Sequence, residues 1–189
     1  SPPRVTAAAT KLLPELRLIP GFALDLTTAD NDGRQWDFDD AAMRERAMRR
    51  VRGDRPMLLV GSPMCTAFST WQRINNKIRD PGVVEAEKRR AVMHLEFCVE
   101  LYREQLRHGR YFLHEHPAYA TSWQEEAMRG LMGEQGVETA TCDQCMYGCK
   151  SAEGSPVKKP TTFLTNALEL AKRLRRRCSG RGGVCARPG

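Results

Sequence analysis

The sequence predicts an α/β protein with a mostly parallel sheet and helices on both faces. Short apolar runs that favour strands alternate with longer stretches whose apolar residues recur at helical spacing. Strands joined through helices run parallel, and a parallel sheet is covered on both of its faces. The apolar fraction of 41% and the charged fraction of 28% are typical of a folded protein rather than a disordered one.

Local signals predict each element in turn. Proline near the N-terminus favours a first helical turn, Asp39 or Asp40 caps a second helix, and Gly109 closes the longest amphipathic stretch. The expected helices are 5–13, 40–51, 83–108, 122–132 and one that opens at Asn166. The expected strands are 22–27, 57–60, 111–113 running into 115–117, 136–141 and 161–165.

A chain of 189 residues is long enough for one domain with a real core. We expect an α/β domain over 1–166 and a basic helix and tail over 167–189. From Lys150 onward the chain has ten Lys and Arg against two acidic residues, so its net charge of +7 comes from this end. The densest run, 172–177, is either the footprint of a polyanion or a solvated helix end that the helix dipole favours.

No apolar run is long enough to cross a bilayer, and the N-terminus lacks the apolar core of a signal peptide. We therefore expect an intracellular protein without a membrane partner. The seven cysteines are then thiols or metal ligands rather than disulfides.

A cysteine loop follows the expected strand 57–60 directly, with the sequence Gly61-Ser-Pro-Met-Cys65-Thr-Ala-Phe-Ser69. A thiol becomes a nucleophile as a thiolate, which a loop between a strand and a helix can stabilise. This loop resembles the nucleophile loop of cytosine-C5 DNA methyltransferases, Gly-X-Pro-Pro-Cys-X-X-Phe-Ser, with Met64 in place of the second proline. The family's Glu-Asn-Pro turn after the next strand corresponds to 115–117, with His116 in place of asparagine.

The resemblance implies a Rossmann-like, class I methyltransferase-like fold and two catalytic side chains. Cys65 would attack C6 of a cytosine held out of the DNA helix, and Glu115 would hold the ring N3 and the exocyclic amine. C5 would then take a methyl group from S-adenosylmethionine. Strand alternation places His114 and His116 on the face opposite Glu115, so these three side chains cannot easily share a metal ion.

On the cofactor side the resemblance is weaker. Family members carry a Phe-X-Gly-X-Gly loop after their first strand, and residues 1–9 do not match it. Asp25 or Asp30 is the candidate for the cofactor ribose, Asp37 for the adenine amine, and Pro63 for a further contact. The alternative for each aspartate is an ordinary cap or turn residue.

Nucleic acid, above all DNA, is the expected partner, and the chain is a candidate part of a larger polyprotein or complex. Trp71 can stack on a base or cover the core, and Arg73 makes the same segment basic. The candidate contacts are Ser69, Trp71, Arg73, Lys158 and Lys159.

A zinc site is the alternative use of the cysteines. Cys142 and Cys145 have the spacing of a ligand pair, and Cys178 and Cys185 can add ligands from the tail. Two functions therefore remain open. One is a minimal or degenerate cytosine-C5 methyltransferase, and the other is a non-catalytic nucleic-acid-binding or assembly module, with or without zinc.

Overall fold

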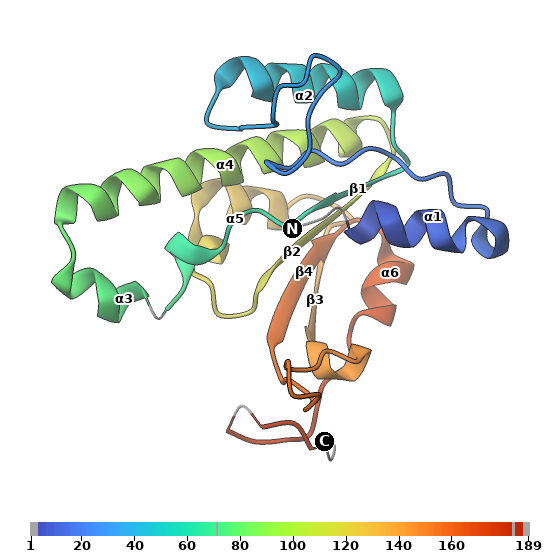
Figure 1. Cartoon of the computed structure of the whole chain (residues 1–189). Helices are drawn as coiled ribbons and strands as arrows, with labels where there is room; N and C mark the ends of the chain where they lie inside the picture. Colours follow the sequence, from blue (N-terminus) through green and yellow to red (C-terminus); the bar gives the residue numbers. More distant parts are fainter. Residues whose placement is uncertain (1–3, 71, 183, 187–189) are drawn as a thin grey trace. The chain divides into compact units, whose positions relative to one another are not determined.

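The computed structural model describes residues 4–70, 72–182 and 184–186 (Figure 1). The chain divides into two compact units, Ser1–Met57 and Leu58–Gly189. Helix α6 (Leu168–Arg173) lies just after the predicted domain boundary between 166 and 167. It contacts the sheet through β3 (Glu138–Asp143) and β4 (Pro160–Thr165). The division into domains at that point stays a prediction.

The first unit contains helices α1 (Arg4–Leu16) and α2 (Ala41–Asp54). The predicted cap of α2 is confirmed, because the Asp40 carboxylate accepts a hydrogen bond of 2.8 Å from the backbone N–H of Ala42. Met43, Ala47 and Val51 recur every four residues on one buried face of this helix.

The strand predicted at 22–27 is wrong, because this segment forms turns. The Thr28 backbone N–H donates to the carbonyl of Asp25 at 2.8 Å, and the Thr28 hydroxyl accepts from the backbone N–H of Asp25 at 3.1 Å. Side chains of Asp and Thr that bond the nearby backbone offer it an alternative to a strand ladder. The apolar residues in this run do not outweigh that local competition.

The second unit holds the sheet, whose remaining strands are β1 (Leu58–Gly61) and β2 (Tyr111–Pro117). Its helices, in chain order, are η1 (Thr66–Phe68), α3 (Gln72–Asn75), η2 (Asn76–Ile78), α4 (Pro81–Arg107), η3 (Thr121–Gln124), α5 (Glu126–Met132), η4 (Gln144–Tyr147) and α6. The long helix predicted at 83–108 is confirmed as α4, which Asp80 caps through the backbone N–H of Val83.

The strand order is β1-β2-β4-β3, and the prediction of a mostly parallel sheet is wrong. Only β1 and β2 pair in parallel, whereas β4 runs antiparallel to both of its neighbours. Parallel neighbours need a crossover connection, usually a helix, and the segment between β3 and β4 contains only the short η4. Because β4 alone is reversed, β1, β2 and β3 still end at the same edge of the sheet.

Helix α4 covers one face of the sheet, and α6 lies on the other side of the strands in Figure 1. The ring of Tyr102 on α4 stacks on Phe112 of β2 with centroids 4.7 Å apart. Strand β2 alternates as predicted, so that Phe112, His114 and His116 are buried on the α4 face while Glu115 is half-buried on the opposite face.

Two buried imidazoles lie next to each other in this core, with ring centroids 5.5 Å apart. The Nδ1 atom of His114 is 2.9 Å from the Tyr102 hydroxyl, and the Nδ1 atom of His116 is 2.5 Å from the Ser122 hydroxyl. Burial, and to a lesser extent the neighbouring His116, lowers the pKa of His114 to about 3. The core is therefore built around a neutral His114.

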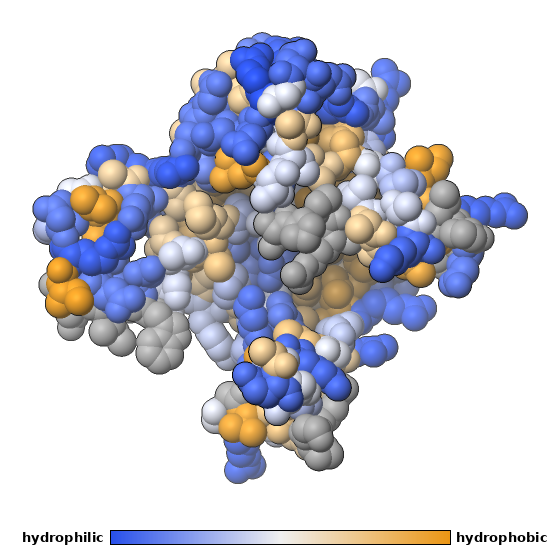
Figure 2. Space-filling view, in the orientation of Figure 1, coloured by the Kyte–Doolittle hydropathy of each residue, from blue (hydrophilic) through white to orange (hydrophobic). Residues whose placement is uncertain are grey.

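Within the described part of the chain, none of the helices is both long and apolar enough to cross a bilayer. On the face shown in Figure 2, hydrophilic residues dominate, and the strongly hydrophobic ones form small separate patches.

His114 predicts a loss of stability in mild acid. Its pKa is 6.5 in an unfolded chain and about 3 in the fold, so between these values the unfolded chain binds a proton that the folded chain excludes. The free energy of unfolding therefore decreases as pH falls through that window, by about 2 kcal/mol between about pH 7.5 and about pH 5. Urea unfolding at both pH values should show that His114→Gln loses this part of the pH dependence. An unchanged pH dependence in the variant would contradict a neutral buried His114.

Candidate active site at the carboxyl ends of β1 and β2

The cysteine loop, residues 61–69, runs from the end of β1 along the end of β2. Phe68 anchors it, since its side chain is 1% exposed and its ring packs edge-on against His116 with centroids 5.8 Å apart. The ammonium of Lys88 lies 4.5 Å from the centre of the Phe68 ring, and Lys88 also pairs with Glu125. Phe68 therefore holds this loop against the core.

Gly61 is needed at the start of the loop because α4 passes directly against it. A Cβ atom at this position would overlap the hydroxyl of Tyr102 and lie 2.9 Å from its ring carbon Cζ. The same hydroxyl bonds His114, which is the register partner of Gly61 across the β1–β2 pair. The backbone of the loop is therefore fixed against both a helix and a strand.

Ser62 connects the two motif turns. Its hydroxyl donates a hydrogen bond of 2.6 Å to the Oε2 atom of Glu115, across 53 positions in the sequence. Glu115 is thereby held at the carboxyl end of β2, next to the loop that carries Cys65. In open α/β sheets this edge, between adjacent parallel strands, is where ligands bind.

His116, at the position of the family's asparagine, supports the loop from inside the core. Desolvation lowers its pKa, while the Glu115 carboxylate and the Pro63 carbonyl oppose this and Lys159 adds to it. Its bond to Ser122 also ties the end of β2 to η3. His116 therefore acts as a neutral hydrogen-bonding residue beneath the loop, and Met64, the other departure from the motif, is exposed.

Cys65 lies in the middle of the cysteine loop, between Ser62 and Phe68. It is a half-buried thiol immediately before η1, and its backbone carbonyl accepts a hydrogen bond of 3.0 Å from the N–H of Phe68. The side chain belongs to a short turn whose two ends are held by Ser62 and Phe68. Such a partly exposed, positioned cysteine can attack an electrophilic carbon as its thiolate.

The predicted cofactor aspartates are used in local turns of the first unit. The Oδ1 atom of Asp25 accepts two hydrogen bonds from Thr27, one from its backbone N–H and one from its hydroxyl. Asp37 accepts from the N–H of Asp39 at 3.0 Å, and Asp30 pairs with Arg46 at 3.1 Å. These side chains match the turn alternative, and their contacts give a bound S-adenosylmethionine no support.

The predicted nucleic-acid residues have different environments. Lys159 is exposed and precedes β4, at the same edge of the sheet as Glu115. Lys158 instead donates to the carbonyl of Gly180. Ser69 is half-buried, and its carbonyl accepts from the N–H of Gln72. Trp71 and the side chain of Arg73 lie outside the described residues.

The basic run 172–177 is held against the rest of the second unit. Arg175 pairs with Glu138 at 2.7 Å, Arg177 with Asp143 at 3.0 Å, and Arg176 lies over the Tyr147 ring. The helix predicted for this run ends at Arg173, because the residues that follow bond to the edge of β3 instead. Much of this positive charge is therefore already paired.

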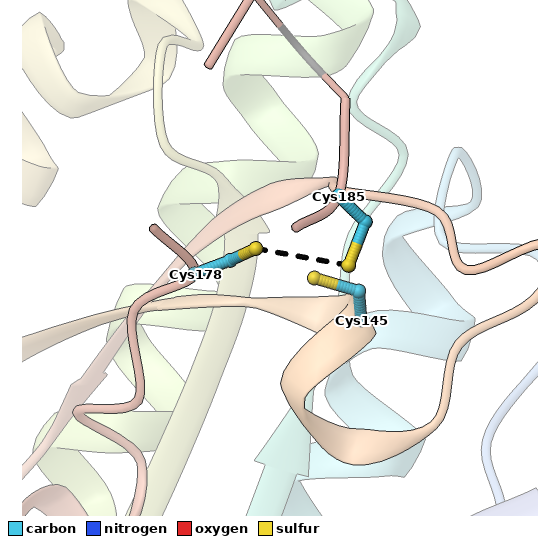
Figure 3. Close-up of side chains that lie close together, drawn as sticks. All are labelled: Cys145, Cys178 and Cys185. Carbon is cyan, nitrogen blue, oxygen red and sulfur yellow. Dashed lines mark hydrogen bonds between the residues drawn. The ribbon is translucent and has the colours of Figure 1, made fainter. Parts of the chain in front are cut away.

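Three cysteines converge near the carboxyl end of β3, as Figure 3 shows. The sulfur atoms of Cys145, Cys178 and Cys185 all lie within 4.8 Å of one another and can hold a metal ion. Cys142, the remaining member of the predicted zinc set, is not in this group. It is buried on β3 opposite Thr161.

Sequence reasoning missed the residues that tie the site together. Ser62 occupies a variable position of the loop signature, and Tyr102 has the spacing of an ordinary core residue on α4. Ser122 was expected only as a helix cap. Their partners are distant in sequence or on other elements, so no local pattern identifies them.

Comparisons with protein-family models, with curated proteins and with solved structures gave no match to this chain.

The close approach at Gly61 predicts that Gly61→Ala destabilises the second unit. The added methyl group forces Tyr102 away from Gly61 and from His114, which should cost about 1–3 kcal/mol in the free energy of unfolding. The matched control is Gly133→Ala, where the new Cβ meets only ordinary contacts at 3.5 Å. Urea unfolding of both variants tests this, and equal stabilities would show that the loop does not depend on this contact.

Proposed function

We propose that this protein binds DNA through a cytosine-C5 methyltransferase-like site, with Cys65 as the nucleophile that adds to C6 of an extruded cytosine. Glu115 is the residue that holds the base. The fold proposed with this function is a class I methyltransferase-like sheet. The proposal rests on the two sequence motifs and on the way their turns lie together.

The hydrogen bond from Ser62 to Glu115 carries the proposal. The loop motif and the glutamate turn are far apart in the chain, and each was recognised on its own residues. Their meeting at one edge of the sheet is what a shared site requires. Strands β1 and β2 are parallel and joined by a helical connection whose main element is α4, which supports the proposed fold.

The chemistry assigned to these residues is a reversible addition. The Cys65 thiolate forms a bond to C6, the electrons of the C5–C6 double bond move to C5, and C5 takes a proton from water. Glu115 favours this step by sharing a proton with N3 and accepting a hydrogen bond from the exocyclic amine, because a proton held at N3 draws electron density from the ring. Loss of the C5 proton and expulsion of the thiolate restore cytosine.

Lys159 is the cation best placed to contact a DNA phosphate next to this site. It is exposed, it lies at the edge where β2 ends, and it is close enough to lower the pKa of His116. Lys158 has a structural contact with Gly180 and is assigned no contact with DNA.

Methyl transfer from S-adenosylmethionine has support only from the resemblance. The aspartates assigned to that cofactor bond residues of their own turns instead. This observation favours the second candidate function, a nucleic-acid-binding module that keeps the base-binding site without methylating the base.

The addition step can be tested without a methyl donor. An oligonucleotide containing 5-azacytosine has a ring nitrogen at position 5, which makes C6 more electrophilic and takes the proton after attack. We expect the full-length protein to form a denaturation-resistant adduct, seen as a shifted band and located at Cys65 by peptide mass spectrometry.

The variants for this experiment are Cys65→Ala, which should form no adduct, and Cys98→Ala, which should react normally. Cys98 lies on α4 and burial raises its pKa to about 12, so it has little thiolate at neutral pH. An adduct on another cysteine, or none at all with DNA bound, excludes Cys65 as nucleophile. DNA binding that persists in Cys65→Ala without any adduct in the wild type would establish the non-catalytic module.

Ser62→Ala is expected to slow adduct formation about tenfold, because Glu115 loses the bond that orients it. Since Ser62 is exposed, the free energy of unfolding should change little. Thr66→Ala, an exposed hydroxyl deletion in the same loop, is the control and should react at the wild-type rate. The measurement is the time course of adduct formation, and equal rates in the two variants would remove Ser62 from the site.

A further inference from the structure

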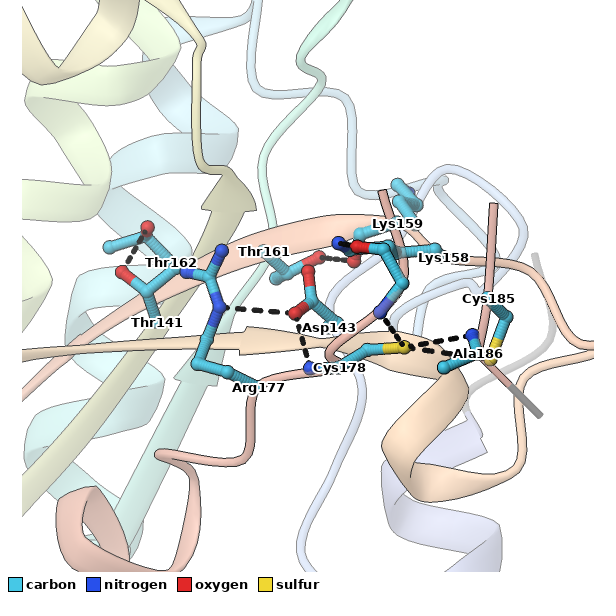
Figure 4. Close-up of polar contacts among 11 residues, drawn as sticks. Thr141, Asp143, Lys158, Lys159, Thr161, Thr162, Arg177, Cys178, Cys185 and Ala186 are labelled. Carbon is cyan, nitrogen blue, oxygen red and sulfur yellow. Dashed lines mark hydrogen bonds and ion pairs between the residues drawn. The ribbon is translucent and has the colours of Figure 1, made fainter. Parts of the chain in front are cut away.

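The C-terminal end of the second unit has almost no hydrophobic core. Among the described residues of 144–159 and 174–186, only Cys145 is buried. The described residues of 174–186 form no helix or strand, yet they are held in place by side-chain and backbone bonds. In Figure 4, Asp143 accepts from the side chain of Arg177 at 3.0 Å and from the backbone N–H of Cys178 at 2.7 Å.

Small regions that cannot bury enough apolar surface commonly depend on a metal ion or a disulfide. Here the only buried side chain, Cys145, faces two sulfur atoms from the tail. The cluster joins η4, at the end of β3, to a segment that otherwise has little to pack against. This is the location where a structural cross-link would contribute most.

The sulfur geometry fits a tetrahedral metal. Zinc–sulfur bonds of about 2.3 Å in a tetrahedral site place sulfur atoms about 3.8 Å apart. The Sγ atoms of Cys178 and Cys185 are 3.7 Å apart. A disulfide would need about 2.05 Å, so this pair has the spacing of two ligands and not of a bond.

The backbone around Cys178 is also shaped for a thiolate. The N–H groups of Gly180 and Ala186 both point to its sulfur at 3.4 Å. The chain turns back so closely that a Cβ atom on Gly180 would lie 2.7 Å from the nitrogen of Ala186 and overlap the carbonyl oxygen of Val184. Amides that donate to a ligand sulfur orient it and balance its charge.

We propose that Cys145, Cys178 and Cys185 bind a structural zinc ion, and that Cys149, whose sulfur atom lies outside the group of three, moves in as the fourth ligand when the metal binds. Cys145 and Cys149 are separated by three residues, within the usual spacing of a zinc-binding pair. Four thiolates and no exchangeable position make the site structural rather than catalytic.

Backbone hydrogen bonds connect Cys149 to segments next to Cys145 and Cys185. Its N–H donates to the carbonyl of Gln144, which precedes Cys145, and its carbonyl accepts from the N–H of Val157 at 3.0 Å. Val157 in turn pairs with Val184, the residue before Cys185. Cys142 has no such position, because β3 holds it on the face of the sheet.

Metal analysis tests this site directly. The full-length protein, purified under reducing conditions without added zinc, should contain about one zinc ion per chain by elemental mass spectrometry. Cys149→Ser and Cys185→Ser should lose most of it, whereas the matched variant Cys142→Ser should keep it. Loss of zinc in Cys142→Ser with retention in Cys149→Ser would overturn the assignment of the fourth ligand.

A second measurement on the wild type covers variants that fail to fold. Removal of zinc with a chelator should increase hydrogen exchange in 174–186 and leave β2 protected, and added zinc should reverse the change. Cobalt in place of zinc should give the visible absorption of a tetrahedral thiolate site. A wild-type protein that holds no zinc, that holds iron instead, or whose tail exchanges equally with and without metal would overturn the proposal.

Discussion

The contact between Gly61 and Tyr102 is the constraint on which the rest of the candidate site depends. Tyr102 stacks on Phe112, bonds His114 and leaves no room for a side chain where the cysteine loop begins. One buried aromatic residue thus sets the spacing of α4, β2 and the loop together. Because packed interiors adjust little, a displacement of Tyr102 or of the Gly61 backbone would also displace Ser62 and Glu115.

The two motifs are brought together by the parallel pairing of β1 and β2. In that register Gly61 lies opposite His114, so the residue after each falls at the same edge of the sheet. Glu115 faces away from the α4 core, while the flanking imidazoles are buried in it. Simple alternation along β2 therefore places the two buried imidazoles on one face of the sheet and the Glu115 side chain on the other.

Many of the positive charges in the C-terminal run are already engaged in contacts within the second unit. Many cations of the C-terminal run are paired with acids of β3 or lie over an aromatic ring. Their first effect is to hold the tail where the three cysteines converge. A basic tail can thus be a structural element, whereas Lys159 at the edge next to Glu115 is exposed.

The sequence alone determined the elements with strong local signals, among them the capped helix at Asp40, helix α4, the strands around both motifs and the alternation that buries His114 and His116. The turns at 22–27 come from local bonds between Asp25 and Thr28, which the apolar pattern of that run did not reveal. The sequence also did not determine the direction of β4 or the choice of Cys145, Cys178 and Cys185 over Cys142. These features depend on contacts between residues far apart in the chain, as the bond between Ser62 and Glu115 also does. Such contacts produce no periodic pattern in the sequence. Only tertiary packing decides them, because it selects among alternatives that are locally equivalent.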